Sequence, residues 1–211
     1  KIYHNGTDSV INNATGHFYV QGENQLTIKA NNNVEILKST GDEAMAKFIP
    51  DGGVELYHNN SKLFETLGNG ARVQGGIMFG SDTADANRIT DYEDGTWTPN
   101  PHDGSCTVAM AKYRKIGNQV TLWARCSGFS DTSTNDMIRI KGLPYATSGS
   151  WLGAAGAMMA MEVSEALGWI AFAEDDQIRF YATSTGSFAQ LRHNELDSGH
   201  EIYFCATYTV N

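Results

Sequence analysis

The sequence has 211 residues, enough for one large domain or two modest ones, and only 18% of them are charged. Its net charge of −9 would repel a polyanion, and no stripe of Lys and Arg reverses that charge locally, so we expect no nucleic-acid partner. The sequence shows no signal peptide and no apolar run of membrane-spanning length. We therefore expect no membrane insertion, and we interpret the sequence as the C-terminal fragment of a longer soluble polypeptide.

Residues 1–80 consist of short apolar runs separated by turn formers. Asn5-Gly6 is a strong tight-turn dipeptide because both residues tolerate a positive φ. Leu26 and Ile28 alternate with polar neighbours, which is the periodicity of a strand, and only residues 42–47 admit a helical turn. The strands expected in this half span residues 2–4, 9–11, 17–20, 25–30, 34–37, 54–57 and 75–80.

This half contains an internal sequence repeat, since residues 2–6 (IYHNG) are similar to residues 56–60 (LYHNN). Repetition of one small unit predicts a structure that grows along an axis. Each unit is thin, and one copy has too few large apolar residues to offset its chain entropy. We therefore expect residues 1–80 to form an intertwined β shaft in which three copies share a core, with Tyr3 and Tyr57 at the trimer interface.

The character of the chain changes after residue 80. Residues 81–90 are polar and acidic and are expected to form a neck, and residues 91–211 carry all four tryptophans and all three cysteines. Successive strand patterns, including separate strands at 106–110 and 111–116, predict a β-sandwich with a jelly-roll-like arrangement. The residues expected to face its core are Val120, Leu122, Ala124 and Cys126 from one strand, and Ile202, Phe204, Ala206, Tyr208 and Val210 from the last.

Several motifs resemble the C-terminal regions of phage tail-fibre proteins, those of marine phages and cyanophages among them. Residues 91–99 (DYEDGTWTP) resemble a DYEEGTWTP segment, residues 113–121 (YRKIGNQVT) a YTKIGNxVT hairpin, and residues 140–145 (IKGLPY) an I-x-x-LP[FY] stretch. The repeats at 2–6 and 56–60 are similar to the IYHDGSNSYI and ELYYDNSKKLET segments of such fibres. The resemblance implies a trimeric fibre whose distal domain contacts the host surface, and it supplies no catalytic residues.

Candidate receptor contacts come from aromatic and polar residues of the second half. An aromatic ring away from the core face can stack on a sugar or pack against another subunit, and we assign Trp123 and Arg125 to the trimer interface. Sugar sites combine such rings with polar loop residues. The predicted receptor contacts are Trp151, Arg192, His193, Asn194, Asp197 and His200.

Enzyme chemistry and cofactors find little support in the sequence. Adjacent acidic pairs such as Asp175-Asp176 suit a hairpin turn better than a catalytic pair held across a cleft. Three copies of His4 or of His58 could coordinate a metal ion on a threefold axis. No further ligand has the spacing that a metal site requires, so we expect no metal and no cofactor. The three cysteines are interpreted as small strand residues, and one intramolecular bridge stays open.

The sequence thus predicts a virion adhesin that is not an enzyme. Its expected partners are two further copies of itself, upstream tail proteins, and a host receptor that is a carbohydrate or lipopolysaccharide. It would be made in the host cytoplasm and exposed to the medium on the virion. Two alternatives remain, namely a tailspike-type polysaccharide depolymerase and a purely structural virion fibre that binds no receptor.

Overall fold

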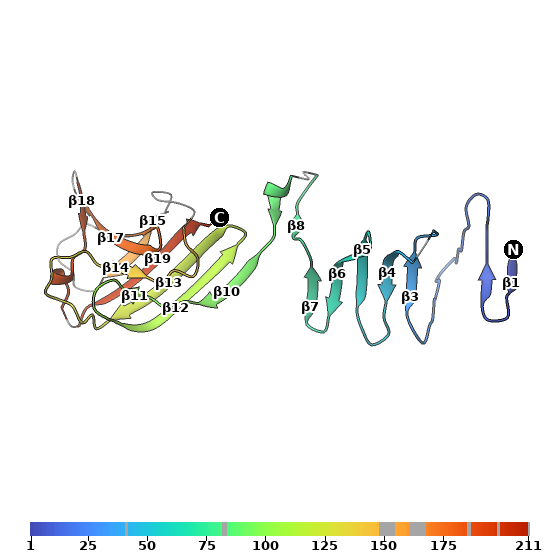
Figure 1. The fold of residues 1–211 in the computed structure, drawn as a ribbon, viewed down its shortest axis with the longest axis horizontal. Coiled ribbons are helices and arrows are strands. Elements are labelled where there is room, and N and C mark those ends of the chain that lie inside the picture. The colour runs from blue at the N-terminus through green and yellow to red at the C-terminus, as the bar shows by residue number, and fades with distance from the viewer. Residues whose placement is uncertain are drawn as a thin grey trace. The chain divides into compact units, whose positions relative to one another are not determined.

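The computed structural model describes residues 1–40, 42–81, 84–147, 155–160, 168–184, 187–197 and 199–210. Its regular elements are β-strands apart from two single-turn 3₁₀ helices, so the all-β prediction is confirmed (Figure 1). The chain forms two compact units, Lys1–Gln74 and Gly75–Asn211, here called unit 1 and unit 2. No helix in the described part of the chain is long and apolar enough to cross a membrane.

Unit 1 contains a hairpin and a five-stranded antiparallel meander in which each strand pairs with the next along the chain (Figure 1). Turn chemistry sets these pairings. Asn59 and Asn60 have φ values of 48° and 60° and connect directly paired His58 and Ser61, as a two-residue hairpin requires. The hairpin strands are β1 (Ile2–His4) and β2 (Ser9–Ile11), and the meander strands are β3 (Val34–Leu37), β4 (Ala44–Phe48), β5 (Val54–His58), β6 (Ser61–Leu67) and β7 (Gly70–Val73).

Two expectations for unit 1 are wrong. The helical turn at 42–47 is instead strand β4, whose backbone pairs with β3 on one side and β5 on the other. The strands expected at 17–20 and 25–30 do not form, because no strand among the described residues offers them backbone partners and a strand needs a ladder. The apolar side chains of these two segments are exposed instead, among them Phe18, Tyr19, Val20, Leu26 and Ile28.

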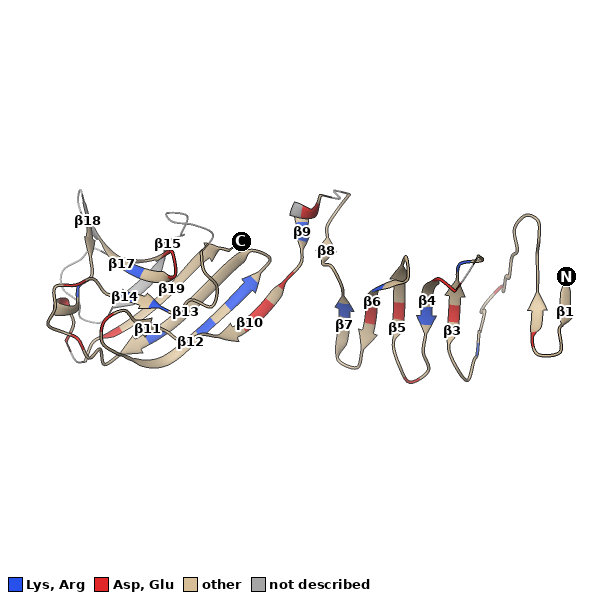
Figure 2. Cartoon of the chain, viewed as in Figure 1, with Lys and Arg blue, Asp and Glu red and all other residues tan. Residues whose placement is uncertain are grey.

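The meander of unit 1 has one apolar and one charged face. Residues directly opposite each other on paired strands share a face, so the pairing register defines each row. One row is apolar across all five strands and consists of Ile36, Ala46, Leu56, Phe64 and Val73. The neighbouring row, on the other face, is charged and consists of Glu35, Lys47, Glu55, Glu65 and Arg72 (Figure 2).

Unit 2 is built around one ten-stranded antiparallel sheet in the order β10-β12-β13-β19-β15-β16-β17-β14-β11, with β18 paired to β17. Strand β15 joins its two halves, pairing with β16 through residues 155–157 and with β19 through residues 158–160. A short separate ladder joins β8 (Ile77–Met78) to β9 (Arg88–Ile89), and η1 (Asp85–Asn87) lies between them. The sheet strands are β10 (Tyr92–Thr96), β11 (Asn100–Pro101), β12 (Thr107–Ile116), β13 (Gln119–Ser127), β14 (Arg139–Lys141), β15 (Ala155–Ala160), β16 (Trp169–Glu174), β17 (Gln177–Ser184), β18 (Ser187–Gln190) and β19 (Glu201–Thr209), and η2 spans His193–Glu195.

The core of unit 2 lies between the two halves of the sheet, in a sandwich-like arrangement. The alternation predicted for β13 and the last strand is confirmed, because every residue expected to face the core is buried. Phe204 of β19 packs edge-on against Phe180 of β17, with ring centroids 5.1 Å apart, and against Trp97 at 6.2 Å. The two strands expected at 106–110 and 111–116 are in fact one, β12, with a β-bulge between Val108 and Met110.

Both expected hairpin turns of unit 2 are confirmed. Gly117 has a φ of 57° and, with Asn118, connects β12 to β13. Asp175 has a φ of 54° and, with Asp176, connects Glu174 to its direct partner Gln177. Asp tolerates this left-handed conformation, so a structural role in the turn accounts for the acidic pair.

The DYEDGTWTP and YRKIGNQVT motifs are neighbours in the sheet. Strand β10 pairs with β12 so that Asp94 lies opposite Arg114, and their side chains form an ion pair with a distance of 2.7 Å between Oδ1 and Nε. Glu93 accepts hydrogen bonds from the hydroxyl groups of Tyr113 and Tyr145. The motif residues therefore hold the edge strand β10 onto the sheet.

Gly95 is required at its position because the ring of its cross-strand partner Tyr113 lies over its backbone. A Cβ atom added there would approach ring atoms of Tyr113 to 2.5 Å. We expect Gly95→Ala to lower the free energy of unfolding of unit 2 by about 1–3 kcal/mol, since the buried ring must shift. Urea denaturation followed by tryptophan fluorescence measures this loss. Gly199→Ala is the matched control, because nothing lies within 4 Å of the added Cβ there, and an equal loss in both variants would contradict the assignment.

Candidate functional site

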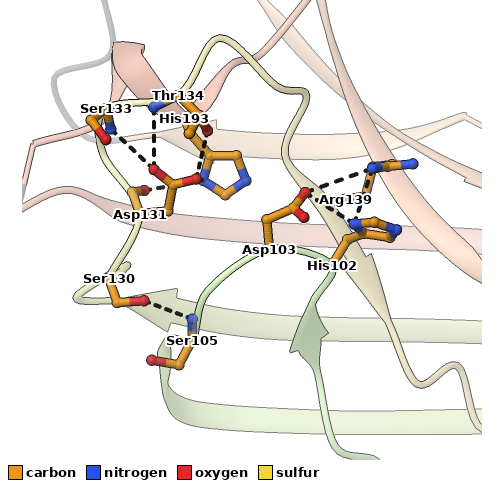
Figure 3. Close-up of polar contacts among 9 residues, drawn as sticks. All are labelled: His102, Asp103, Ser105, Ser130, Asp131, Ser133, Thr134, Arg139 and His193. Atoms are coloured by element: carbon orange, nitrogen blue, oxygen red, sulfur yellow. Dashed lines mark hydrogen bonds and ion pairs between the residues drawn. The ribbon is translucent and has the colours of Figure 1, made fainter.

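Three loops and one strand of unit 2 meet in a network of polar contacts, shown in Figure 3. The network joins the segment after β11, the segment between β13 and β14, the turn η2, and strand β14 itself. We call it the loop cluster. Its members are His102, Asp103, Ser105, Ser130, Asp131, Ser133, Thr134, Arg139 and His193.

Asp131 organises the segment between β13 and β14. Its Oδ1 accepts the backbone N–H groups of Ser133 at 3.1 Å and Thr134 at 3.2 Å, and its Oδ2 accepts the Thr134 hydroxyl at 2.5 Å. These bonds stabilise the ionised carboxylate. The Thr134 hydroxyl first, then the Ser133 N–H, lower the pKa of Asp131 to about 2, with smaller contributions from the Thr134 N–H and His193.

His193 also belongs to the network, and its side chain is fully buried. Its Nδ1 donates to the backbone carbonyl of Asp131 at 3.0 Å and lies 3.9 Å from the Oδ2 of the same residue. Its backbone N–H donates to the carbonyl of Asp136 at 3.0 Å. The Nε2 atom is buried without a hydrogen-bond partner, and Figure 3 shows the ring lying between Asp131 and Asp103.

The segment after β11 is attached by two further sets of bonds. His102 Nδ1 lies 3.0 Å from Asp103 Oδ2, and Arg139 Nη2 lies 3.6 Å from the same carboxylate oxygen. The contact with His102, followed by the charges of His102, Arg139 and His193, lowers the pKa of Asp103. Ser105 N donates to Ser130 Oγ at 2.8 Å, and Ser130 N donates back to the Ser105 carbonyl at 2.9 Å.

The loop cluster supports an exposed polar surface. The network lies next to polar residues that are exposed, although the side chains of His102, Ser130 and Thr134 also bond within it. These exposed residues are His102, Ser105, Ser130, Ser133, Thr134, Asn135 and Asn194. Hydroxyl, amide and imidazole groups on fixed loops can bind the hydroxyl groups of a sugar.

The low pKa of Asp131 gives the cluster a defined response to acid. A carboxylate whose pKa is lowered by folding stabilises the fold fully at pH values above its ordinary pKa, near 3.9. This stabilisation is lost as the pH falls through the pKa of the folded state, about 2. We expect the Tm of the wild-type protein to fall between pH 5 and pH 2 by more than the Tm of Asp131→Asn. Scanning calorimetry at both pH values measures the difference. Asp197→Asn is the control, since its side chain is 90% exposed, and an unchanged pH response in Asp131→Asn would contradict the role.

The predicted receptor residues occupy different environments. Asn194 and Asp197 are exposed, whereas His193 and His200 are buried. Arg192 is half-buried, and its guanidinium donates to the Asn135 carbonyl. Trp151 lies outside the described residues. The turn around η2 is thus part of the loop cluster. Its histidines, His193 and His200, are buried, whereas the side chains of Asn194 and Asp197 are exposed.

Sequence reasoning missed Asp103, Asp131 and Arg139, which the fold brings to the same place. One signal was available for Asp131, because an Asp followed by Ser133 and Thr134 is typical of a turn in which the carboxylate accepts the next N–H groups. Nothing in the sequence indicated that this turn would meet the segment after β11. That contact depends on the pairing of β11 with β14.

The residues assigned to the trimer interface lie on three different sheets. Trp123 and Arg125 are half-buried on the outer face of β13, where Arg125 lies 5.0 Å from the ring centroid of Tyr203 and pairs with Glu201 at 2.7 Å. Tyr3 is 45% exposed on β1. Tyr57 is half-buried on β5 and donates its hydroxyl hydrogen to Glu55.

His4 and His58 are both exposed and stand beside turns of unit 1. Among the described residues, no three His, Cys, Asp or Glu side chains are grouped so that they could hold a metal ion. A ring of histidines contributed by three copies stays a hypothesis.

The comparisons with known proteins add no identification. No protein-family model, no curated protein and no solved structure matches this chain.

Proposed function

We propose that the chain is the distal part of a homotrimeric phage tail fibre that attaches the virion to a host surface glycan or outer-membrane component. Unit 1 would supply an intertwined β shaft, and unit 2 a jelly-roll-like terminal domain that carries the receptor contacts. The ordered motifs of residues 2–6, 56–60, 91–99, 113–121 and 140–145 support this function. The uncovered apolar face of the unit 1 meander supports the assembly.

That apolar face is partly exposed in a single chain, although Ala46 at its middle is buried. Ile36 is 50% exposed, Leu56 45% and Val73 40%, although all three stand in one continuous row. A groove of about 710 Å³ in the same unit has a mixed lining that includes apolar Val34 and Phe48 and polar Lys29 and Asn32. A contiguous apolar patch on a soluble protein marks a surface that another molecule covers. The closed core of unit 2 provides a contrast within the same chain.

Further copies of the same chain are the occupants that best fit this face. An amphipathic sheet with one apolar and one charged face can bury the first and hydrate the second when several copies close around an axis. The charged face is already satisfied within one chain, since Lys62 pairs with Glu55 at 2.9 Å and Lys47 with Glu35 at 3.3 Å. Three thin copies would therefore build the core that one copy lacks.

Receptor binding would use the polar surface over the loop cluster. Three copies per fibre raise the effective affinity of individually weak sites, so a modest set of hydrogen-bonding groups is sufficient for attachment. Rigid support of the loops also limits the entropy lost on binding. Exposed Asn194 and Asp197 are the first residues to test there.

A depolymerase is less well supported. Glycoside hydrolysis needs a carboxylic acid whose pKa is raised so that it can protonate the leaving group. In the described part of the chain every shifted carboxyl pKa is lowered, and these groups are Glu55, Glu93, Asp94, Asp103, Asp131 and Glu201. They are hydrogen-bonded or ion-paired anions, which suit structural roles.

Two measurements on the intact chain test the proposal. Light scattering after size exclusion should give about 69 kDa, three times the chain mass of 23.0 kDa, whereas 23 kDa would refute the shared core. Fluorescently labelled protein should bind a subset of bacterial strains and surface glycans, and free glycan should compete. A trimer that binds no cell and no glycan would indicate a purely structural fibre, and release of reducing sugar would indicate a depolymerase.

A further inference from the structure

The outer face of the paired strands β14 and β17 gathers positive charge, although the net charge of the chain is −9. Ile140 and Ile178 of these strands are fully buried in the core, so the residues next to them in the sequence point to the opposite face. On that face Arg139 of β14 lies directly opposite Arg179 of β17, and Lys141 follows two residues later along β14. Three cations therefore share a small area of the sheet.

Carboxylates offset these cations only in part. Arg179 Nη1 lies 2.9 Å from Glu174 Oε2, and Arg139 Nη2 lies 3.6 Å from Asp103 Oδ2. Lys141 has no ion pair with any residue that the structure describes. Like charges directly opposite each other destabilise a sheet, so the arginine pair carries a cost that an added anion would remove.

Each guanidinium group also keeps hydrogen-bond donors that the described chain does not use. An Arg side chain has five N–H donors in a planar fork. Arg139 makes its described contacts through Nη2 alone, to Asp103 and, at 3.0 Å, to His102 (Figure 3), and Arg179 makes its own through Nη1 alone. The Nε atoms of both arginines have no hydrogen-bond partner. The two side chains are 25% and 21% exposed, so both remain partly accessible from outside.

Two aromatic rings lie beside the arginines on the same face. Phe172 of β16 is directly opposite Arg179, and Tyr181 follows Arg179 by two residues along β17. Both rings are half-buried, their centroids are 6.2 Å apart, and their planes meet at 83°. Aromatic surface of this kind packs against the C–H groups of a sugar ring. Cations beside aromatic rings suit an acidic sugar better than a free ion.

We propose that this face binds an oxyanion group, a phosphate or a carboxylate, of a host surface glycan. The inference rests on the proposed function, because it assigns the chemical class of the receptor. Arg139 and Arg179 stand on adjacent strands, so one oxyanion between them accepts hydrogen bonds from both forks and removes their mutual repulsion. The sugar ring that carries the oxyanion packs on Phe172 and Tyr181.

An acidic turn limits this face at one end. Asp175 and Asp176, which connect β16 to β17, are exposed. Arg139 and Arg179 lie further from this turn than Lys141 does, since the register places Lys141 opposite the first residue of β17. The oxyanion is therefore assigned to the two arginines, and Lys141 attracts it over a longer range that salt screens.

The test measures binding of the intact protein to two matched pairs of sugars on a neutral polyacrylamide carrier. The pairs are mannose 6-phosphate with mannose, and glucuronic acid with glucose. In at least one pair the charged sugar should bind about tenfold or more tightly than the neutral one. This preference should shrink as NaCl rises from about 50 mM to about 500 mM. The pair with the larger preference distinguishes phosphate from carboxylate. Equal binding within both pairs, or no binding to any of the four, would overturn the proposal.

Substitutions assign the binding to this face. Arg139→Gln and Arg179→Gln should each weaken binding of the preferred charged sugar about tenfold. Arg114→Gln is the matched control, because it removes an arginine that is paired with Asp94 on β10, and it should bind like the wild type. Wild-type affinity in both Gln variants, or an equal loss in the control, would contradict the assignment.

Two milder variants keep the test decisive if either Gln variant folds poorly. Arg179→Lys retains the charge beside Glu174 but lacks the planar fork, so it should keep the wild-type Tm and still lose affinity. Lys141→Gln breaks no described ion pair and should weaken binding about threefold at low salt. If both variants keep the wild-type Tm and the wild-type affinity, the proposal is wrong.

These results are separable from those that test the fibre. A protein of 23.0 kDa in solution, or one that binds no bacterial cell, would refute the proposed function while leaving the measured preference for charged sugars intact. A trimer that binds cells but does not distinguish charged from neutral sugars would refute this inference alone.

Discussion

Replacing Leu56 by Asp is expected to convert a trimer of about 69 kDa, three times the chain mass of 23.0 kDa, into a monomer. Leu56 lies at the centre of the apolar row of unit 1, between Ala46 and Phe64 on the neighbouring strands. In a trimer the three new carboxylates would be buried without partners, which costs several kcal/mol per charge. In a monomer the same carboxylate stays hydrated, so the substitution acts on assembly. Light scattering over a concentration series measures the shift.

The matched control for Leu56→Asp is Glu55→Ala, one residue earlier on the charged face. It removes the ion pair with Lys62 but leaves the apolar row untouched, so it should remain a trimer. Equal dissociation in both variants would mean that the meander as a whole is destabilised. A Leu56→Asp protein that remains trimeric would show that the apolar row is not the interface.

Replacing Phe204 by Ala is expected to lower the free energy of unfolding of unit 2 by about 3–5 kcal/mol. Phe204 is 4% exposed and joins the two halves of the sheet through its ring contacts with Phe180 and Trp97. Removing the ring takes away buried apolar area and leaves a cavity. The paired strands cannot move far enough to fill that cavity. Chemical denaturation monitored by tryptophan fluorescence gives the loss.

Tyr203→Ala provides the comparison for Phe204→Ala, because it deletes an aromatic ring from the adjacent position of the same strand. Tyr203 lies on the outer face, where it contacts Arg125 and donates its hydroxyl hydrogen to Glu201 at 2.7 Å. Its removal should cost much less than the removal of Phe204. Similar losses for the two variants would contradict the assignment of inner and outer faces.

Much of unit 2 could be read from its sequence, because period-two alternation and turn residues are local signals. Val120, Leu122, Ala124 and Cys126 alternate with partly exposed neighbours, and all four are buried in the structure. The Gly117 turn was predictable for the same reason, since a two-residue hairpin favours a residue that tolerates a positive φ. Such patterns are set within a few residues of chain.

Unit 1 shows where local patterns are insufficient. Residues 25–30 have the alternation of a strand, yet no segment in the described ranges pairs with them, so the ladder does not form. Residues 42–47 admitted a helical turn, and pairing on both sides made the segment a strand instead. In both cases the deciding factor was the availability of a neighbouring strand, which alternation within a segment does not encode.

The sequence by itself determined the all-β class, the inward residues of the long strands and the tight turns, because each depends on the chemistry of adjacent residues. The tertiary structure alone decided which loops meet, bringing His193 against Asp131 and Ser105 against Ser130. It also showed that Ile36, Leu56 and Val73 of the apolar row of unit 1 stay exposed in one chain. These features arise from strand order and register, which join residues far apart in the sequence through backbone hydrogen bonds, and no local pattern specifies those partners.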